Sequence, residues 1–146
     1  MKKVFSLLIL LLVLAGCSTN ETSNYHYIFV GESEHWKAKY DVEGTEVWKD
    51  EEGNRISYSH EDSYEFLLEY KGTLTKLASF NKLEYSFRTS SGGGSSKLNL
   101  DYSLQDLQFT RRGSSINGAK LSKDEVIKVI VKWGNNKEKI ELQSKK

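Results

Sequence analysis

The chain has 146 residues, with 21 Lys and Arg against 20 Asp and Glu, and it contains six Phe, eight Tyr and three Trp. This length predicts a single domain. The aromatic content excludes a disordered chain, because that much apolar surface offsets the entropy of ordering a core. The formal net charge of +1 argues against a nucleic-acid partner, since binding phosphates requires clustered, unopposed cationic side chains.

The N-terminal segment has the organisation of a secretory signal peptide. Lys2 and Lys3 precede an apolar run from Val4 to Ala15 that is broken only by Ser6. A membrane-spanning helix needs about 20 apolar residues, whereas the apolar region of a signal peptide needs only about 7 to 15. The run therefore predicts export rather than a membrane-spanning helix.

The apolar run ends in Leu14-Ala15-Gly16-Cys17, which resembles the bacterial lipobox. The resemblance implies that a peptidase recognises Leu14, Ala15 and Gly16, removes residues 1–16, and leaves Cys17 as the first mature residue. It also implies that the Cys17 thiol carries diacylglycerol, so that the lipid membrane is a partner and the protein lies at the extracytoplasmic face of the cell membrane. The alternative is an ordinary exported protein with a free cysteine.

Residues 17–24 are expected to be the lipidated cysteine and a flexible tether, because 18–24 contain no apolar side chain. Residues 25–146 then form the folded domain. Cys17 is the only cysteine of the chain, so no disulfide stabilises this domain.

Alternating apolar and polar residues dominate the domain and predict half-buried antiparallel strands. The apolar members of the clearest runs are Trp36, Ala38, Tyr40 and Val42; Tyr64, Phe66, Leu68 and Tyr70; Leu83, Tyr85 and Phe87; and Leu98, Leu100 and Tyr102. Residues 25–30 are apolar on both faces apart from His26, which predicts a more central strand. Ser122–Glu125 matches a helix capping box, but the β-branched residues between Val126 and Val131 favour a strand.

Turn residues fall between these runs. Gly53 or Asn54 is expected to provide the positive φ of one hairpin, and Gly134–Lys137 the turn of another. Seven to nine short strands without a sustained helix predict an all-β protein, specifically an antiparallel two-sheet sandwich of immunoglobulin-like outline. A small closed barrel is the alternative.

Several short segments resemble small lipoproteins of Gram-positive bacteria that carry an uncharacterised β-rich domain. These segments are Gly31–Trp36, Tyr70–Gly72, Lys123–Ile127 and Lys132–Asn135. The resemblance implies the fold and the location, and it brings no activity with it.

No catalytic signature or cofactor site is evident, and we expect no enzyme activity, no cofactor and no metal. The imidazoles of His26, His35 and His60 lack the spacing of a zinc motif. Residues 50–61 have part of a calcium-loop spacing, but Arg55 stands where the turn glycine belongs. The sequence also contains no Gly-x-Ser-x-Gly elbow, which makes a hydrolase the least favoured function.

Binding through loops at the ends of a rigid β-domain is therefore the expected function. The candidate loops are 31–35, 59–63 and 89–96, joined by 111–115. The candidate ligand-binding residues are His35, Trp36, His60, Arg111 and Arg112. We expect a non-enzymatic interaction module that binds an envelope protein; a cell-wall glycan or a small ligand is the alternative. Trp36 and Trp48 can stack on sugar rings, although alternation favours a core position for Trp36.

Overall fold

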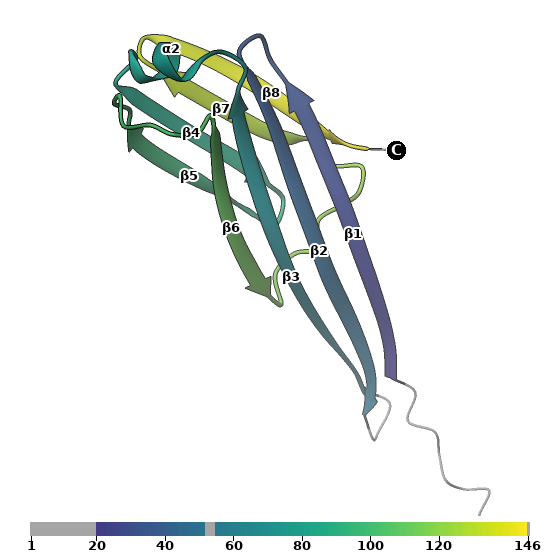
Figure 1. Ribbon diagram of the computed structural model, residues 1–146. Helices are drawn as coiled ribbons and strands as arrows, with labels where there is room; N and C mark the ends of the chain where they lie inside the picture. Colours follow the sequence, from purple (N-terminus) through teal and green to yellow (C-terminus); the bar gives the residue numbers. More distant parts are fainter. Residues whose placement is uncertain (1–19, 52–54, 146) are drawn as a thin grey trace, which may run out of the picture.

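The computed structural model describes residues 20–51 and 55–145, and these residues form one curled antiparallel sheet (Figure 1). The sheet has eight strands in the order β5-β4-β7-β8-β1-β2-β3-β6. The strands are β1 (Asn20–Glu32), β2 (Trp36–Glu51), β3 (Arg55–Tyr70), β4 (Lys82–Thr89), β5 (Gly92–Asn99), β6 (Gln108–Ile116), β7 (Ile127–Trp133) and β8 (Asn136–Ser144). The described residues also contain one short helix, α2 (Leu74–Ala78).

The sheet consists of two four-stranded halves that meet at one corner. Strands β1, β2, β3 and β6 form one half, and β5, β4, β7 and β8 form the other. Only the pairs Phe29–Ser144 and Val30–Gln143 join β1 to β8. At this corner the backbones approach closely, because a Cβ atom on Gly31 would lie 2.3 Å from the backbone oxygen of Glu141. The all-β antiparallel class is confirmed, and the single, nearly closed sheet corresponds to the expected barrel alternative.

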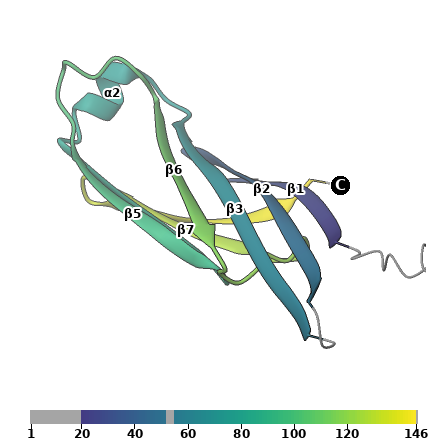
Figure 2. The ribbon, with the colours of Figure 1, turned by 90° about the horizontal axis from the view of Figure 1, so that it is seen from below.

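The opposite side of the curl is an open seam between the edge strands β5 and β6. In Figure 2 these strands diverge toward α2 and approach one another at their other ends. Across the seam, Arg111 Nη1 donates a hydrogen bond to the backbone oxygen of Ser95, at 2.8 Å.

The core fills the space between the two halves, and its residues are those that alternation places on the inner face. Phe66 of β3 stacks on Phe87 of β4 with a centroid separation of 4.5 Å. The fully buried large side chains are Trp36, Phe29, Phe66, Leu68, Leu77, Leu83, Leu121, Ile127, Ile140, Leu142, His60 and Val129. Burial of this aromatic and aliphatic set is the main stabilising term, since each such side chain contributes about 1.5–3 kcal/mol.

Two expected boundaries are wrong. Residues 20–24 belong to β1 and pair with residues 45–49 of β2, so the tether does not extend through them. Their polar side chains were mistaken for a linker because both strands here extend beyond the core, where neither face needs apolar residues. Tyr102 also lies outside any strand and is exposed, since β5 ends at Asn99.

Three of the four expected recognition loops are strands. Residues 59–63 lie inside β3, residues 92–96 form most of β5, and residues 111–115 lie inside β6. Turns remain at Ser33–His35 between β1 and β2, and at Ser90–Ser91 between β4 and β5. The sequence was misleading because polar or glycine-rich residues can occupy an edge strand or a strand end, where hydrogen bonding rather than apolar burial maintains the pairing.

The turn expectations are confirmed where the structure describes them. Gly134 has φ +54° in the β7–β8 hairpin, whose turn is shorter than expected because β8 begins at Asn136. Strand β7 follows the capping-box sequence, as the β-branched residues predict. Strands β2 and β3 form the expected hairpin, whereas Gly53 and Asn54 lie outside the described residues.

Candidate functional site

The five candidate residues do not converge on one site. His35 and Trp36 lie where β1 turns into β2, whereas His60 pairs with Glu46 in the outer part of the β2–β3 ribbon. The ten residues from Trp36 to Glu46 correspond to roughly 33 Å of strand. Arg111 and Arg112 lie on β6, with adjacent positions that face opposite sides of the sheet.

His35 is part of a hydrogen-bonded group that holds the β1–β2 turn against β8. Glu138 Oε1 lies 2.6 Å from His35 Nδ1, and Glu138 Oε2 accepts hydrogen bonds from Ser33 Oγ at 2.5 Å and from the His35 backbone N–H at 3.1 Å. Burial raises the pKa of Glu138, but the hydrogen bonds from Ser33 and His35 outweigh it and leave the pKa below its usual value. The hydrogen bonds from Ser33 and His35 thus explain how the Glu138 carboxylate can be half-buried beside the β1–β2 turn.

The same end brings together a possible metal-ligand set. One ligand atom each from Glu34, His35 and Glu138 lies within 4.8 Å of the others. Glu34 is adjacent to His35 in the sequence, whereas Glu138 is distant and enters the group only through the β7–β8 hairpin, so local spacing does not indicate it. The hydrogen bonds above already occupy Glu138, so this set gives no separate reason to propose a cation.

Trp36 does not present its ring to solvent. It is fully buried against Tyr70 and Trp133, at centroid separations of 4.9 and 5.5 Å. Its indole nitrogen has no hydrogen-bond partner among the described residues. Trp36 is therefore a core residue, as its alternation indicates, and it cannot stack on a sugar.

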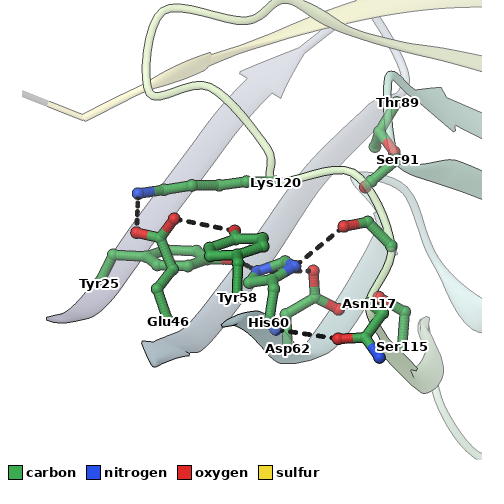
Figure 3. Close-up of polar contacts among 11 residues, drawn as sticks. Tyr25, Glu46, Tyr58, His60, Asp62, Thr89, Ser91, Ser115, Asn117 and Lys120 are labelled. Carbon is green, nitrogen blue, oxygen red and sulfur yellow. Dashed lines mark hydrogen bonds and ion pairs between the residues drawn. The ribbon is translucent and has the colours of Figure 1, made fainter. Parts of the chain in front are cut away.

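His60 is fully buried and fixes the segment that follows β6 (Figure 3). Its Nδ1 lies 3.1 Å from the backbone oxygen of Gly118, and its Nε2 lies 2.7 Å from the hydroxyl of Tyr25. A carbonyl oxygen only accepts, so Nδ1 carries a proton, and in the neutral imidazole Tyr25 donates to Nε2. Both ring nitrogens are thus used within the protein.

Asn117 completes the attachment of this segment to β3. Its side-chain oxygen accepts from the His60 backbone N–H at 3.2 Å, and its own backbone N–H donates to the His60 carbonyl at 2.6 Å. Asn117 has φ +56°, a conformation that asparagine adopts more readily than most residues. Nearby, Ser115 donates to Asp62 at 2.8 Å. The β6 end is therefore fixed by polar contacts rather than by apolar packing.

Glu46 and Lys120 form an ion pair beside this network. Glu46 also accepts from the Tyr58 hydroxyl at 3.0 Å, and the Lys120 ammonium lies 4.9 Å from the centroid of the Tyr25 ring. The hydrogen bond from Lys120 holds the pKa of Glu46 below its usual value despite the opposing effect of burial, and the hydrogen bond from Tyr58 acts in the same direction. Burial raises the pKa of Tyr25.

We expect acid to loosen the 117–121 segment through Glu46. Its pKa is lower in the folded state than the ordinary value of 4.5, so the stabilisation is complete above that pH and is lost as pH falls through the folded-state pKa. The free energy of unfolding, measured with urea at several pH values between 6 and 3, tests this expectation. Glu46→Gln should flatten part of the acid slope, and Glu61→Gln, at an exposed site on the outer face of β3, should leave it unchanged. An identical slope in wild type and Glu46→Gln would contradict the assignment.

Arg111 and Arg112 have different surroundings. Arg112 Nε donates to Glu65 Oε2 at 2.6 Å on the outer face, so its charge is already paired. Arg111 extends across the seam to β5, where its Nη1 bonds the Ser95 carbonyl. Of the two, Arg111 retains the charge available to a ligand.

Arg111 lies beside a groove of about 940 Å³ around the glycine-rich start of β5. Arg88 of β4 and Lys128 of β7 line the same groove and are direct partners in the β4–β7 register. Within the described part of the chain, none of these three cations forms an ion pair with a carboxylate. The remaining lining residues are Ser86, Phe87, Thr89, Ser90, Ser91, Gly92, Gly93, Gly94, Ser95 and Ile130. We call this the basic groove.

The basic groove joins two of the expected recognition segments, 89–96 and 111–115, although both are largely strand. Arg88 and Lys128 are not recognisable as candidates from the sequence alone. They stand at outward positions of alternating strands, where a cationic side chain is ordinary, and only the register reveals that they face each other. Glu141 pairs with Lys128 from the other side in β8, beyond ion-pair distance.

The match to a known protein family lies at the N-terminus. A family model described as "Prokaryotic membrane lipoprotein lipid attachment site" matches residues 1–18, which include the Leu14–Cys17 segment. The chain is a membrane-anchored bacterial lipoprotein. Residues 1–17 lie outside the described part of the structure, so the signal peptide and the acylation of Cys17 are inferred from sequence.

No curated protein and no solved structure matches the lipoprotein. The resemblance to small Gram-positive lipoproteins therefore stays a prediction. Among the described residues, no helix is long and apolar enough to cross a membrane.

Proposed function

We propose that the lipoprotein is a non-enzymatic interaction module at the extracytoplasmic face of the cell membrane, and that its basic groove binds an acidic segment of an envelope protein. The observation that carries this proposal is the placement of Arg88 directly opposite Lys128, with Arg111 on the same groove and, among the described residues, no ion pair between any of the three and a carboxylate.

Charge repulsion makes this placement informative. Like charges directly opposite each other on adjacent strands destabilise a sheet, and an anionic ligand between them converts that repulsion into attraction. Arginine also binds a carboxylate through two parallel N–H donors, which provides orientation as well as charge. The groove therefore suits carboxylates presented on a chain.

The glycines of β5 allow Phe87 and Arg111 to approach the backbone closely at this position. A Cβ atom on Gly94 would lie 2.7 Å from ring atoms of Phe87 and 2.9 Å from Arg111 Nε. A larger residue would displace Arg111 from the groove or separate β5 from β4. β5 is an edge strand, so an extended partner segment can also add to its free side.

The surroundings of His60 support the non-enzymatic part of the proposal. A general base needs access to the substrate proton, whereas the His60 ring is fully buried and both its nitrogens have partners inside the protein. Glu46 is likewise engaged by Lys120 and Tyr58. These groups fix a segment of chain, and a hydrolase stays the least favoured function.

A cell-wall glycan or a small ligand is the second candidate. It is favoured by one observation, the exposure of Trp48, whose ring lies 4.4 Å from that of Tyr58. Sugar rings stack on exposed aromatic faces of this kind.

We expect removal of the groove charges to abolish partner capture. The double variant Arg88→Ala, Lys128→Ala should reduce the partner protein recovered by cross-linking in intact membranes by about tenfold or more, since each charged hydrogen bond contributes about 1.5–3 kcal/mol. Lys132 and Lys137 also face each other but lie outside the groove, so Lys132→Ala, Lys137→Ala is the matched control and should change recovery less than about twofold.

Two outcomes would overturn this proposal. Equal recovery with the groove variant and the control variant would show that the groove does not bind the partner. Saturable binding to isolated peptidoglycan with no cross-linked protein would favour the glycan candidate instead.

A further inference from the structure

The ribbon formed by β1, β2 and β3 extends well past the part of the sheet that encloses the core (Figure 1). On its inner face, near the β2–β3 turn, three apolar side chains are exposed. The exposed fractions are 41% for Trp48, 72% for Ile56 and 43% for Tyr58. We call these three residues the aromatic end. No segment of the described chain covers them in the way that residues 117–121 cover His60.

The aromatic end lies next to the point where the lipid is attached. In the β1–β2 register, Trp48 pairs with Glu21 and Lys49 pairs with Asn20. Cys17 precedes Asn20 by three residues, which span at most roughly 11 Å. The acylated sulfur is therefore confined to the same end of the molecule as these exposed side chains.

We propose that the aromatic end rests in the interfacial layer of the lipid bilayer to which Cys17 is attached. The occupant of this surface is lipid, at the boundary between headgroups and acyl chains. The proposal uses the anchor but is independent of the basic groove.

The chemistry of the three side chains suits this layer. Tryptophan and tyrosine favour membrane interfaces, because an apolar ring and a polar tip are satisfied there together. The Tyr58 hydroxyl already donates to Glu46, so its ring can enter the layer without exposing an unpaired hydroxyl. Ile56, the most exposed of the three, pairs in register with Asp50 at the far end of the ribbon and would enter deepest.

The surrounding charges predict how this contact behaves. The neighbouring charged residues in the described chain are Glu21, Lys49, Asp50, Glu51 and Arg55, which provide no net positive charge. Attraction to anionic lipids requires clustered Lys or Arg. Contact should therefore form on zwitterionic phosphatidylcholine and should be insensitive to salt.

The contact would also orient the basic groove. Arg111 pairs with Phe66, which lies eight residues along β3 from Tyr58. Eight strand residues correspond to roughly 26 Å. With the aromatic end on the bilayer, the groove stands away from the headgroups and open to an envelope partner.

Trp48 provides a direct probe, since Trp36 and Trp133 are buried in the core. The mature lipidated protein is reconstituted in phosphatidylcholine vesicles whose acyl chains carry bromine, which quenches tryptophan only at short range. We expect bromolipid to quench the Trp48 emission at least about twofold, and Trp48→Phe to remove the quenched component. In the same vesicles, Trp48 should be at least about threefold less accessible to aqueous iodide than in the unlipidated chain.

Variants separate this contact from the anchor itself. Ile56→Ser, Tyr58→Ser should restore iodide access to Trp48 while the protein stays on the vesicles through its lipid. Ile116→Ser, at a residue that is 73% exposed on the outer face of β6, is the matched control and should change nothing. Unchanged iodide access on vesicles, or bromolipid quenching that survives Ile56→Ser, Tyr58→Ser, would overturn the proposal. Trp48 protection by isolated peptidoglycan without any bromolipid quenching would assign the aromatic end to a glycan instead.

Discussion

Replacing Phe66 with alanine is expected to lower the free energy of unfolding by about 3–5 kcal/mol. Phe66 is fully buried and stacks on Phe87, with Tyr85 at a centroid distance of 5.7 Å. It joins the inner faces of the two half-sheets, so the cavity left by alanine cannot collapse without moving both. Urea unfolding of the purified protein, followed by far-ultraviolet circular dichroism, measures the loss.

The size of this loss matters because domains of ordinary stability have only about 5–15 kcal/mol in total. Phe66→Leu keeps most of the volume and should cost less than about 1.5 kcal/mol. If the alanine and leucine variants were equally stable, the stacked pair would not be at the centre of the core.

Replacing Cys17 with alanine is expected to reduce incorporation of a labelled fatty acid into the protein to background. The thioether requires the sulfur, and no other cysteine is present. Two acyl chains provide durable anchoring, since each buried methylene contributes about 0.8 kcal/mol, whereas the three side chains of the aromatic end are too few to replace them. Metabolic labelling followed by immunoprecipitation measures the effect.

The adjacent variant Ser18→Ala is the control for this labelling experiment, because it leaves the sulfur in place and should label like the wild type. Incorporation that persists in Cys17→Ala would place the acyl group on another residue and would contradict the lipobox assignment.

The core was the most predictable part of the fold. Trp36, Ala38, Tyr40 and Val42 alternate with charged residues, and all four are buried, because one face of the sheet is closed by the other half. Period-two alternation determines which face a side chain occupies irrespective of which strands become neighbours. The class of fold could therefore be predicted from the sequence.

The outer ribbon could not be predicted in the same way. His60 and Asp62 lie on the inner face, yet their polarity suggested a loop at 59–63. Polar residues occupy inward positions here because the 117–121 segment, rather than a second half-sheet, covers them and supplies hydrogen-bond partners. Nothing in the local sequence around His60 indicates that Asn117 will contact it.

The candidate site shows the same limit. The local sequence identifies Arg111 as a candidate, and the structure places it on the basic groove. Arg88 and Lys128 were missed because their opposition depends on the register of β4 with β7, two strands separated by about 40 residues. Of the other candidates, Trp36 lies in the core, and Arg112 forms an ion pair with Glu65.

The aromatic end could not be predicted from the sequence, because nothing in the sequence indicates that the β2–β3 hairpin extends past the core. Trp48 and Tyr58 alternate like core residues, but no second half-sheet reaches them. Their exposure, combined with three residues of chain back to Cys17, links the fold to the anchor.

The most direct test of this account is the intact mass of the mature protein purified from membranes. We expect a chain that begins at Cys17, lacks residues 1–16, and carries the added mass of a diacylglyceryl group on its first residue. An unmodified thiol on an uncleaved 146-residue chain would contradict the anchor, and with it the placement of the aromatic end at the bilayer.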